Sequence, residues 1–118
     1  MKLEVGMYIR TNYGKIDKIL KLNESYVKGV SQKDEFYAYD IEKIVKASYN
    51  IIDILEVGDY VNGYKVSAIY NPNGDEIVNI TLIMEYGYET INTYIDDYSI
   101  NSIVTKEQFE QMAYKVVE

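Results

Sequence analysis

The sequence predicts a mainly β protein made of two tandem, small, five-stranded barrels, each followed by a short helix. The first observation is an internal repeat, because residues 4–9 return as residues 56–61 and residues 39–45 return as residues 98–104. The first pair is 52 residues apart and the second is 59 apart, so the second copy contains an insertion. The second observation is a series of short apolar segments separated by turn signals, which is typical of small barrels. Repetition of one supersecondary unit predicts that both copies share one architecture.

Copy one contains five segments with the composition of short strands. A turn is expected at Asn12-Tyr13-Gly14, because asparagine and glycine tolerate positive φ angles. The apolar residues of the second segment do not alternate strictly, which indicates a β-bulge or a bend near Lys18. The five expected strands cover residues 7–11, 15–22, 25–30, 36–39 and 41–45.

A short helix is expected to connect the two copies. Ser48 is a residue type that caps helix N-termini, and a helix across residues 49–55 would place Ile51, Ile52 and Leu55 on one stripe. We therefore expect a helical connector at residues 48–55.

Copy two is expected to contain a longer hairpin, which holds the inserted residues. Residues 71–75, Asn-Pro-Asn-Gly-Asp, are the strongest turn signal in the chain. Thr105 and Gln108 have the spacing of a capping box, which predicts a helix over residues 106–113. The expected strands of copy two cover residues 60–61, 64–70, 77–88 and 89–94, with residues 114–117 as a last strand or an extended tail.

These elements predict a first barrel module at residues 1–47 and a second, acidic barrel module with a C-terminal helix at residues 56–118. A unit of this size buries a smaller fraction of its surface than a larger domain does and is marginal alone. We therefore expect the two modules to pack as one unit.

The chain of 118 residues contains no cysteine and no histidine. The absence of cysteine removes disulfides, thiolate nucleophiles and sulfur ligands for zinc. The absence of histidine removes the usual general base near neutral pH and the commonest transition-metal ligand. We therefore expect a non-catalytic protein without a cofactor or a metal site.

Composition also bears on the compartment. The hydrophobic content of 47% and the single proline argue for a folded chain without linkers. No apolar run approaches the length of a membrane span, and the first residues lack the apolar stretch of a signal peptide. A cytoplasmic protein with no membrane partner is expected.

Charge is distributed unevenly between the copies. Residues 1–47 contain 9 basic and 7 acidic side chains, whereas residues 48–118 contain 3 basic and 12 acidic side chains. Nucleic-acid binders normally carry a clear positive excess, because phosphate neutralisation supplies most of their affinity. Direct nucleic-acid binding is therefore not favoured, although copy one offers a candidate basic patch. The patch consists of Arg10, Lys15, Lys18, Lys21, Lys28 and Lys33.

The acidic copy contains the candidate partner-binding residues. Adjacent strand residues point to opposite faces, so Asp96 and Asp97 cannot easily chelate one ion. Their spacing also lacks the pattern of a calcium-binding loop. Two interpretations stay open, a solvated acidic surface and a partner-binding face with flanking aromatic rings. The candidate partner-binding residues are Glu85, Glu89, Asp96, Asp97, Tyr86, Tyr88 and Tyr94.

Tyrosine is frequent, with 14 tyrosines against two phenylalanines and no tryptophan. Exposed aromatic side chains between hairpins can form a cage for a peptide or a methylated cation. The alternative is packing within the barrels, because tyrosine is a good strand former and its hydroxyl can find a buried partner. The tyrosines in question in copy one are Tyr8, Tyr13, Tyr26, Tyr37 and Tyr39.

Two resemblances concern the setting of the protein. The opening of the chain resembles the first hairpin of Src-homology-3-like barrels of the KOW and Tudor kind, through the pattern Val5-Gly6-x-Tyr8-Ile9-Arg10-Thr11-x-x-Gly14-Lys15-Ile16. Residues 51–66, together with residues 103–110, are similar to small uncharacterised phage and prophage proteins of low-GC Gram-positive bacteria. The resemblance implies a mobile-element setting and assigns no catalytic activity.

These observations predict a non-catalytic binding protein. The acidic, tyrosine-rich second copy favours a protein partner with a basic surface, because electrostatic complementarity sets partner choice and association rate. In the setting that the resemblance implies, the partner would be a host nuclease or another nucleic-acid-binding protein, and the chain would be an acidic, anti-CRISPR-like or other anti-defence inhibitor. The alternatives are a structural docking module of a phage and a direct nucleic-acid-binding barrel.

Overall fold

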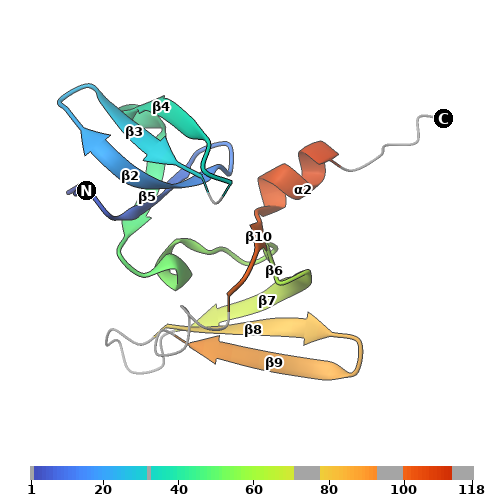
Figure 1. The fold of residues 1–118 in the computed structure, drawn as a ribbon. Helices are drawn as coiled ribbons and strands as arrows, with labels where there is room; N and C mark the ends of the chain where they lie inside the picture. The colour runs from blue at the N-terminus through green and yellow to red at the C-terminus, as the bar shows by residue number, and fades with distance from the viewer. Residues whose placement is uncertain (1, 32, 71–77, 93–99, 113–118) are drawn as a thin grey trace. The chain divides into compact units, whose positions relative to one another are not determined.

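The computed structural model describes residues 2–31, 33–70, 78–92 and 100–112. The chain forms two compact units, Met1–Ile54 and Leu55–Glu118. Each unit contains one five-stranded antiparallel sheet (Figure 1), so the fold is mainly β, as the sequence predicts.

The first unit contains the first sheet, with the strand order β4-β3-β2-β1-β5. Two short 3₁₀ helices, η1 and η2, precede and follow its last strand. The elements are β1 (Tyr8–Thr11), β2 (Ile16–Leu22), β3 (Tyr26–Val30), β4 (Phe36–Asp40), η1 (Ile41–Lys43), β5 (Ile44–Ser48) and η2 (Ile51–Ile54).

The second unit contains the second sheet, with the strand order β10-β6-β7-β8-β9. One α-helix follows its last strand. The elements are β6 (Tyr60–Val61), β7 (Tyr64–Tyr70), β8 (Asn79–Met84), β9 (Gly87–Asn92), β10 (Ile103–Val104) and α2 (Lys106–Met112).

The prediction of two closed Src-homology-3-like barrels, each followed by a helix, is wrong. Among the described residues, the two end strands of each sheet do not pair with each other, so both sheets are open. Closing a sheet requires a matched tilt and stagger of all its strands. In the second sheet, β6 and β10 contain only two residues each. An α-helix follows only the second sheet in the described part of the chain. The expected connector helix is replaced by η2, because β-branched Ile51, Ile52 and Ile54 disfavour an α-helix.

The two sheets have equivalent strand orders, and the internal repeat extends to backbone detail. Gly6 and Gly58 lie in the residues before the first strand of each copy, with φ angles of 94° and 99°. The Gly6 N–H donates to the Ile19 carbonyl at 2.9 Å, and the Gly58 N–H donates to the Val66 carbonyl at 3.0 Å. A non-glycine residue would be strained at these φ angles, which explains why both copies contain glycine there.

A register shift follows the same position in each copy. The pairing of β2 with β3 shifts between Ile19 and Lys21, and the pairing of β7 with β8 shifts between Val66 and Ala68. The first shift lies beside the position near Lys18 where the irregular apolar pattern predicts a bulge. Each sheet therefore changes its side-chain alternation within its second strand.

Each unit has an apolar interior on one side of its sheet. The first unit contains a buried apolar cluster that consists of Ile9, Ile19, Val27, Tyr39 and Ile44. Four partly buried residues pack against this cluster, namely Leu3, Met7, Ile41 and Ala47. The buried apolar residues of the second unit are Leu55, Val61, Val66, Ile80, Leu82 and Ile91.

Candidate functional site

A carboxylate lies on the core side of the first sheet. Asp17 in β2 is directly opposite Ile9 in β1, and residues directly opposite each other in an antiparallel pair share a face. Because Ile9 belongs to the buried cluster, Asp17 is also on the core side, and its side chain is buried.

Gly29 in β3 leaves the space that Asp17 occupies. A Cβ atom at position 29 would lie 2.8 Å from the Asp17 Cβ and 3.4 Å from the Tyr39 Cε2. A glycine inside a strand permits this close approach, which any other residue would obstruct. Asp17 and Tyr39 therefore meet across β3, which lies between their own strands in the sheet.

The Asp17 carboxylate has one hydrogen-bonded oxygen and one without a partner. The Tyr39 hydroxyl donates to Asp17 Oδ2 at 2.6 Å. Among the described residues, Asp17 Oδ1 is the buried side-chain oxygen that lacks a hydrogen bond. An unsatisfied buried polar atom destabilises a fold by about 1–3 kcal/mol, so such an atom calls for a functional or structural explanation.

Burial changes the acidity of both partners. Burial raises the pKa of the Asp17 carboxyl above its usual 3.8, while the Tyr39 hydrogen bond and the nearby Lys15 charge act in the opposite direction. Burial, followed by the hydrogen bond to Asp17, raises the pKa of Tyr39 far above its usual value. Tyr39 therefore stays protonated at physiological pH and continues to donate to Asp17.

Two partly exposed tyrosines and a lysine complete this site. The ring centroids of Tyr13 and Tyr39 are 6.5 Å apart, and those of Tyr37 and Tyr39 are 6.3 Å apart. Lys15 Nζ lies 3.4 Å from the centroid of the Tyr37 ring, which is a close cation–π contact. We call Tyr13, Lys15, Asp17, Tyr37 and Tyr39 the tyrosine–aspartate cluster.

The cluster has the chemistry of a cation-binding site. Tyr13 and Tyr37 are 45% and 37% exposed, so two rings are accessible beside the buried Tyr39. The Tyr37 hydroxyl donates to Glu35 Oε2 at 2.6 Å, which places a second carboxylate next to the rings and raises the Tyr37 pKa. Aromatic faces and carboxylates attract ammonium and guanidinium groups.

The structure places four of the sequence candidates on the β8–β9 hairpin. Glu85 and Tyr86 form its turn, since Met84 pairs with Gly87. The turn therefore lies earlier than the sequence boundary at residues 88–89, at a place where the φ of 138° at position 87 requires glycine. Tyr86 and Tyr88 are 95% and 73% exposed.

Glu85 and Glu89 are also exposed, and neither forms an ion pair with any described residue. The structure thus brings Glu85, Tyr86, Tyr88 and Glu89 together on one hairpin. The other three candidates, Tyr94, Asp96 and Asp97, lie outside the described residues.

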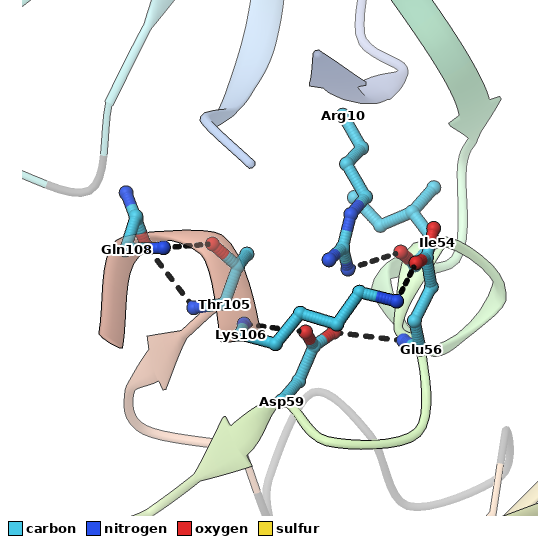
Figure 2. Close-up of polar contacts among 7 residues, drawn as sticks. All are labelled: Arg10, Ile54, Glu56, Asp59, Thr105, Lys106 and Gln108. Atoms are coloured by element: carbon cyan, nitrogen blue, oxygen red, sulfur yellow. Dashed lines mark hydrogen bonds and ion pairs between the residues drawn. The ribbon is translucent and has the colours of Figure 1, made fainter. Parts of the chain in front are cut away.

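A third polar group, built around Asp59, has a structural role (Figure 2). Asp59 is buried, and its two oxygens accept hydrogen bonds from the backbone N–H groups of Glu56 and Lys106, at 2.7 and 2.9 Å. Lys106 Nζ forms an ion pair with Glu56 Oε1 at 2.6 Å. Asp59 therefore ties the start of α2 to the turn before β6.

The expected capping box is confirmed. The Thr105 N–H donates to Gln108 Oε1 at 3.1 Å, and the Gln108 N–H donates to Thr105 Oγ1 at 3.3 Å (Figure 2). These reciprocal bonds satisfy backbone donors at the start of α2. Ser48, the other expected cap, accepts from the Asn50 N–H at 3.0 Å in the connector that forms η2.

Arg10 does not belong to a basic surface. It is fully buried, and its Nη1 donates to the backbone carbonyl of Ile54 at 3.1 Å (Figure 2). The candidate basic patch of copy one therefore loses its only arginine.

Sequence reasoning identified Tyr13, Tyr37 and Tyr39 as cage candidates but missed Asp17. The register shift in β2 hides the alternation that would place Asp17 on the core side. Gly29 offered the available signal, because a glycine inside a strand marks a close approach.

The described residues contain no group of acidic side chains that could hold a metal ion. No helix among them combines the length and the apolar character needed to cross a membrane. Comparison with protein-family models, curated proteins and solved structures finds no match for this chain.

Proposed function

We propose that this chain is a non-catalytic binding protein whose tyrosine–aspartate cluster receives a cationic side chain from a protein partner with a basic surface. The observation that supports this proposal is the Lys15 ammonium, which lies 3.4 Å from the centroid of the Tyr37 ring. The chain's own lysine thus occupies a position that a lysine or arginine of the partner can take.

Replacement of Lys15 by a cationic side chain of the partner would give that side chain favourable contacts. A second cation would gain the ring face that Lys15 leaves and would lie near the Glu35 carboxylate, which accepts a hydrogen bond from the Tyr37 hydroxyl. Cation–π contacts contribute about 0.5–1 kcal/mol at exposed sites and about 2 kcal/mol when desolvated. A single cationic side chain therefore gives selectivity, and the remaining affinity comes from a wider contact.

The β8–β9 hairpin is the second element of the proposal. Residues 66–105 contain six acidic side chains and no lysine or arginine. Glu85 and Glu89 accompany the exposed rings of Tyr86 and Tyr88 on this hairpin. An acidic surface with exposed tyrosines accelerates the approach of a basic partner and provides aromatic anchors.

More specifically, we propose that the partner is a host nucleic-acid-handling protein, and that the chain takes the form of an inhibitor that occupies its basic groove. The resemblance to phage proteins and the acidity of the second copy support this form. The groove of such an enzyme is built for phosphates, and carboxylates on a sheet offer similar charge.

The test uses a fluorescein-labelled lysine-rich peptide, with a glutamine-for-lysine peptide as its control, and measures binding by fluorescence anisotropy. Lys15→Gln removes the resident cation and should strengthen binding several-fold, whereas Tyr37→Ala should weaken it. Lys18→Gln removes the same charge from the opposite face of β2 and controls for the change in net charge. Equal effects of Lys15→Gln and Lys18→Gln would show that the cluster has no specific role.

A further inference from the structure

The face of the first sheet opposite the tyrosine–aspartate cluster carries lysines and aromatic rings in register. Tyr8 is directly opposite Lys18, and Lys18 is directly opposite Val30, which in turn pairs with Phe36. These four residues form one row across β1, β2, β3 and β4. Lys18 Nζ lies 5.4 Å from the centroid of the Tyr8 ring.

A second row contains two like charges in direct opposition. Lys21 in β2 pairs with Lys28 in β3, and Lys28 pairs with Ala38 in β4. Like charges directly opposite each other destabilise a sheet unless a counter-charge lies between them. Neither lysine forms an ion pair with a described residue, and both are exposed. The sheet therefore presents a position suited to an anionic group.

The two lysines also line a cavity of about 350 Å³. Its other lining residues are Leu22, Asn23 and Tyr26, so no carboxylate lines it. Asn23 Oδ1 accepts hydrogen bonds from the backbone N–H groups of Ser25 and Tyr26, which fixes the turn beside the cavity. The cavity thus offers two ammonium groups and an aromatic ring on a defined hairpin.

Exposed aromatic rings lie on the same face as the cavity. Tyr26 is 47% exposed and Phe36 is 59% exposed, and Lys28 Nζ lies 5.6 Å from the centroid of the Phe36 ring. Asp40, opposite Tyr26, is a carboxylate at the end of this face, whereas Lys18, Lys21 and Lys28 contribute three positive charges. We call Lys18, Lys21, Tyr26, Lys28 and Phe36 the lysine–aromatic face.

We propose that the lysine–aromatic face binds single-stranded nucleic acid, with a phosphate between Lys21 and Lys28 and bases stacked on Tyr26 and Phe36. Single strands are bound without sequence preference by positively charged surfaces on which aromatic rings stack the bases. The net charge of −7 does not oppose this proposal, because charges beyond roughly 8 Å are largely screened at physiological salt. The proposal goes beyond the proposed function and does not depend on it.

The test measures fluorescence anisotropy of fluorescein-labelled oligothymidylate and oligouridylate with the full chain at several salt concentrations. Two neutralised phosphates, one between Lys21 and Lys28 and one at Lys18, predict a slope of log K against log salt of about −1.4. Lys21→Gln with Lys28→Gln should reduce this slope and weaken binding, while Lys33→Gln, which removes an exposed lysine of the β3–β4 turn, should change binding little. Tyr26→Leu should weaken binding about tenfold at an unchanged slope, because it removes stacking and keeps the charge.

Controls separate this site from general electrostatics. Tyr70→Leu replaces a comparably exposed tyrosine of the second unit and should leave oligothymidylate binding unchanged. Circular dichroism melting establishes that each variant is folded. Absence of binding by the wild-type chain, or an equal loss for Lys33→Gln, overturns the proposal. Competition by polyglutamate as effective as that by unlabelled oligothymidylate also overturns it, because the face would then prefer an acidic peptide.

Discussion

Tyr39 and Asp17 are joined by a 2.6 Å hydrogen bond that passes over the strand between their own strands. The bond is possible because Gly29 leaves the intervening strand without a side chain. It fixes the central ring of the tyrosine–aspartate cluster, against which both Tyr13 and Tyr37 lie. The geometry of the partly exposed rings therefore depends on a buried pair.

Replacing Gly29 with alanine should destabilise the first unit. The new Cβ would lie 2.8 Å from the Asp17 Cβ, and this contact cannot be relieved by rotating a side chain. Overpacking of this kind lowers the free energy of unfolding by about 1–3 kcal/mol. Urea denaturation of Gly29→Ala measures the change, and a midpoint equal to that of the wild type would contradict the close approach.

Removing the Tyr39 hydroxyl should cost more than removing an exposed one. Tyr39→Phe leaves both oxygens of the buried Asp17 carboxylate without a donor, which lowers the free energy of unfolding by about 1–3 kcal/mol. Tyr26→Phe is the matched control, because Tyr26 is exposed. Equal urea midpoints for the two variants would show that the bond contributes nothing to stability.

The Asp17 carboxyl should make stability depend on pH. Its pKa is raised in the folded state by burial, so the folded chain holds this proton more tightly than the unfolded chain. The contribution of the protonated Asp17 carboxyl to the free energy of unfolding is fully present below its usual pKa of 3.8. It is lost as the pH rises through the higher pKa of the folded state. The wild type should therefore lose stability relative to Asp17→Asn over this window. Urea titrations of both proteins from about pH 3 to pH 7 measure the difference, and a constant difference would contradict the raised pKa.

Glu85 and Glu89 should affect association and leave folding unchanged. Both are exposed, so their replacement by glutamine should change the free energy of unfolding by no more than about 0.5 kcal/mol. The association rate with a lysine-rich peptide should fall and become less sensitive to salt. Stopped-flow fluorescence measures the rate, and Glu24→Gln with Glu42→Gln removes the same charge from the first unit as a control. Equal rate losses for the two pairs would argue against a role for the hairpin.

Asp59 should contribute more to stability than the capping threonine. Asp59→Ala removes the acceptor of two backbone N–H groups and should lower the free energy of unfolding by about 2 kcal/mol. Thr105→Ala removes one capping bond and should lower it by about 1 kcal/mol. Urea denaturation ranks the two variants, and the reverse order would show that Asp59 does not anchor α2.

Features that depend on local sequence could be predicted. The repeat indicated the shared strand order, and the Thr105–Gln108 spacing identified the start of α2. Barrel closure could not be predicted, because it depends on the tilt and stagger of all the strands of a sheet together. The connector forms a 3₁₀ helix, η2, in place of an α-helix, because its β-branched isoleucines disfavour the α-helical backbone.

The tyrosine–aspartate cluster was predicted only in part, because its composition is local but its assembly is not. The tyrosines of copy one were identifiable by composition, but their assembly with Asp17 depends on pairing across three strands. Arg10 was expected on the surface and is buried. Its burial could not be predicted, because its partner, the Ile54 carbonyl, lies 44 residues away in the sequence. Long-range pairing of this kind leaves no periodic signal in one sequence.

The register shift in β2 determines which chemistry each side of the first sheet displays. Lys18 and Lys21 are an odd number of residues apart, so a regular strand would direct them to opposite sides. The shift between Ile19 and Lys21 brings both lysines to one side, and Asp17 remains on the other. The second sheet has the same shift between Val66 and Ala68, where the sequence is Val-Ser-Ala. The same backbone irregularity thus separates Asp17 from Lys21 in the first copy. The second copy has Tyr64 and Ala68 at the equivalent positions and contains the irregularity without that effect.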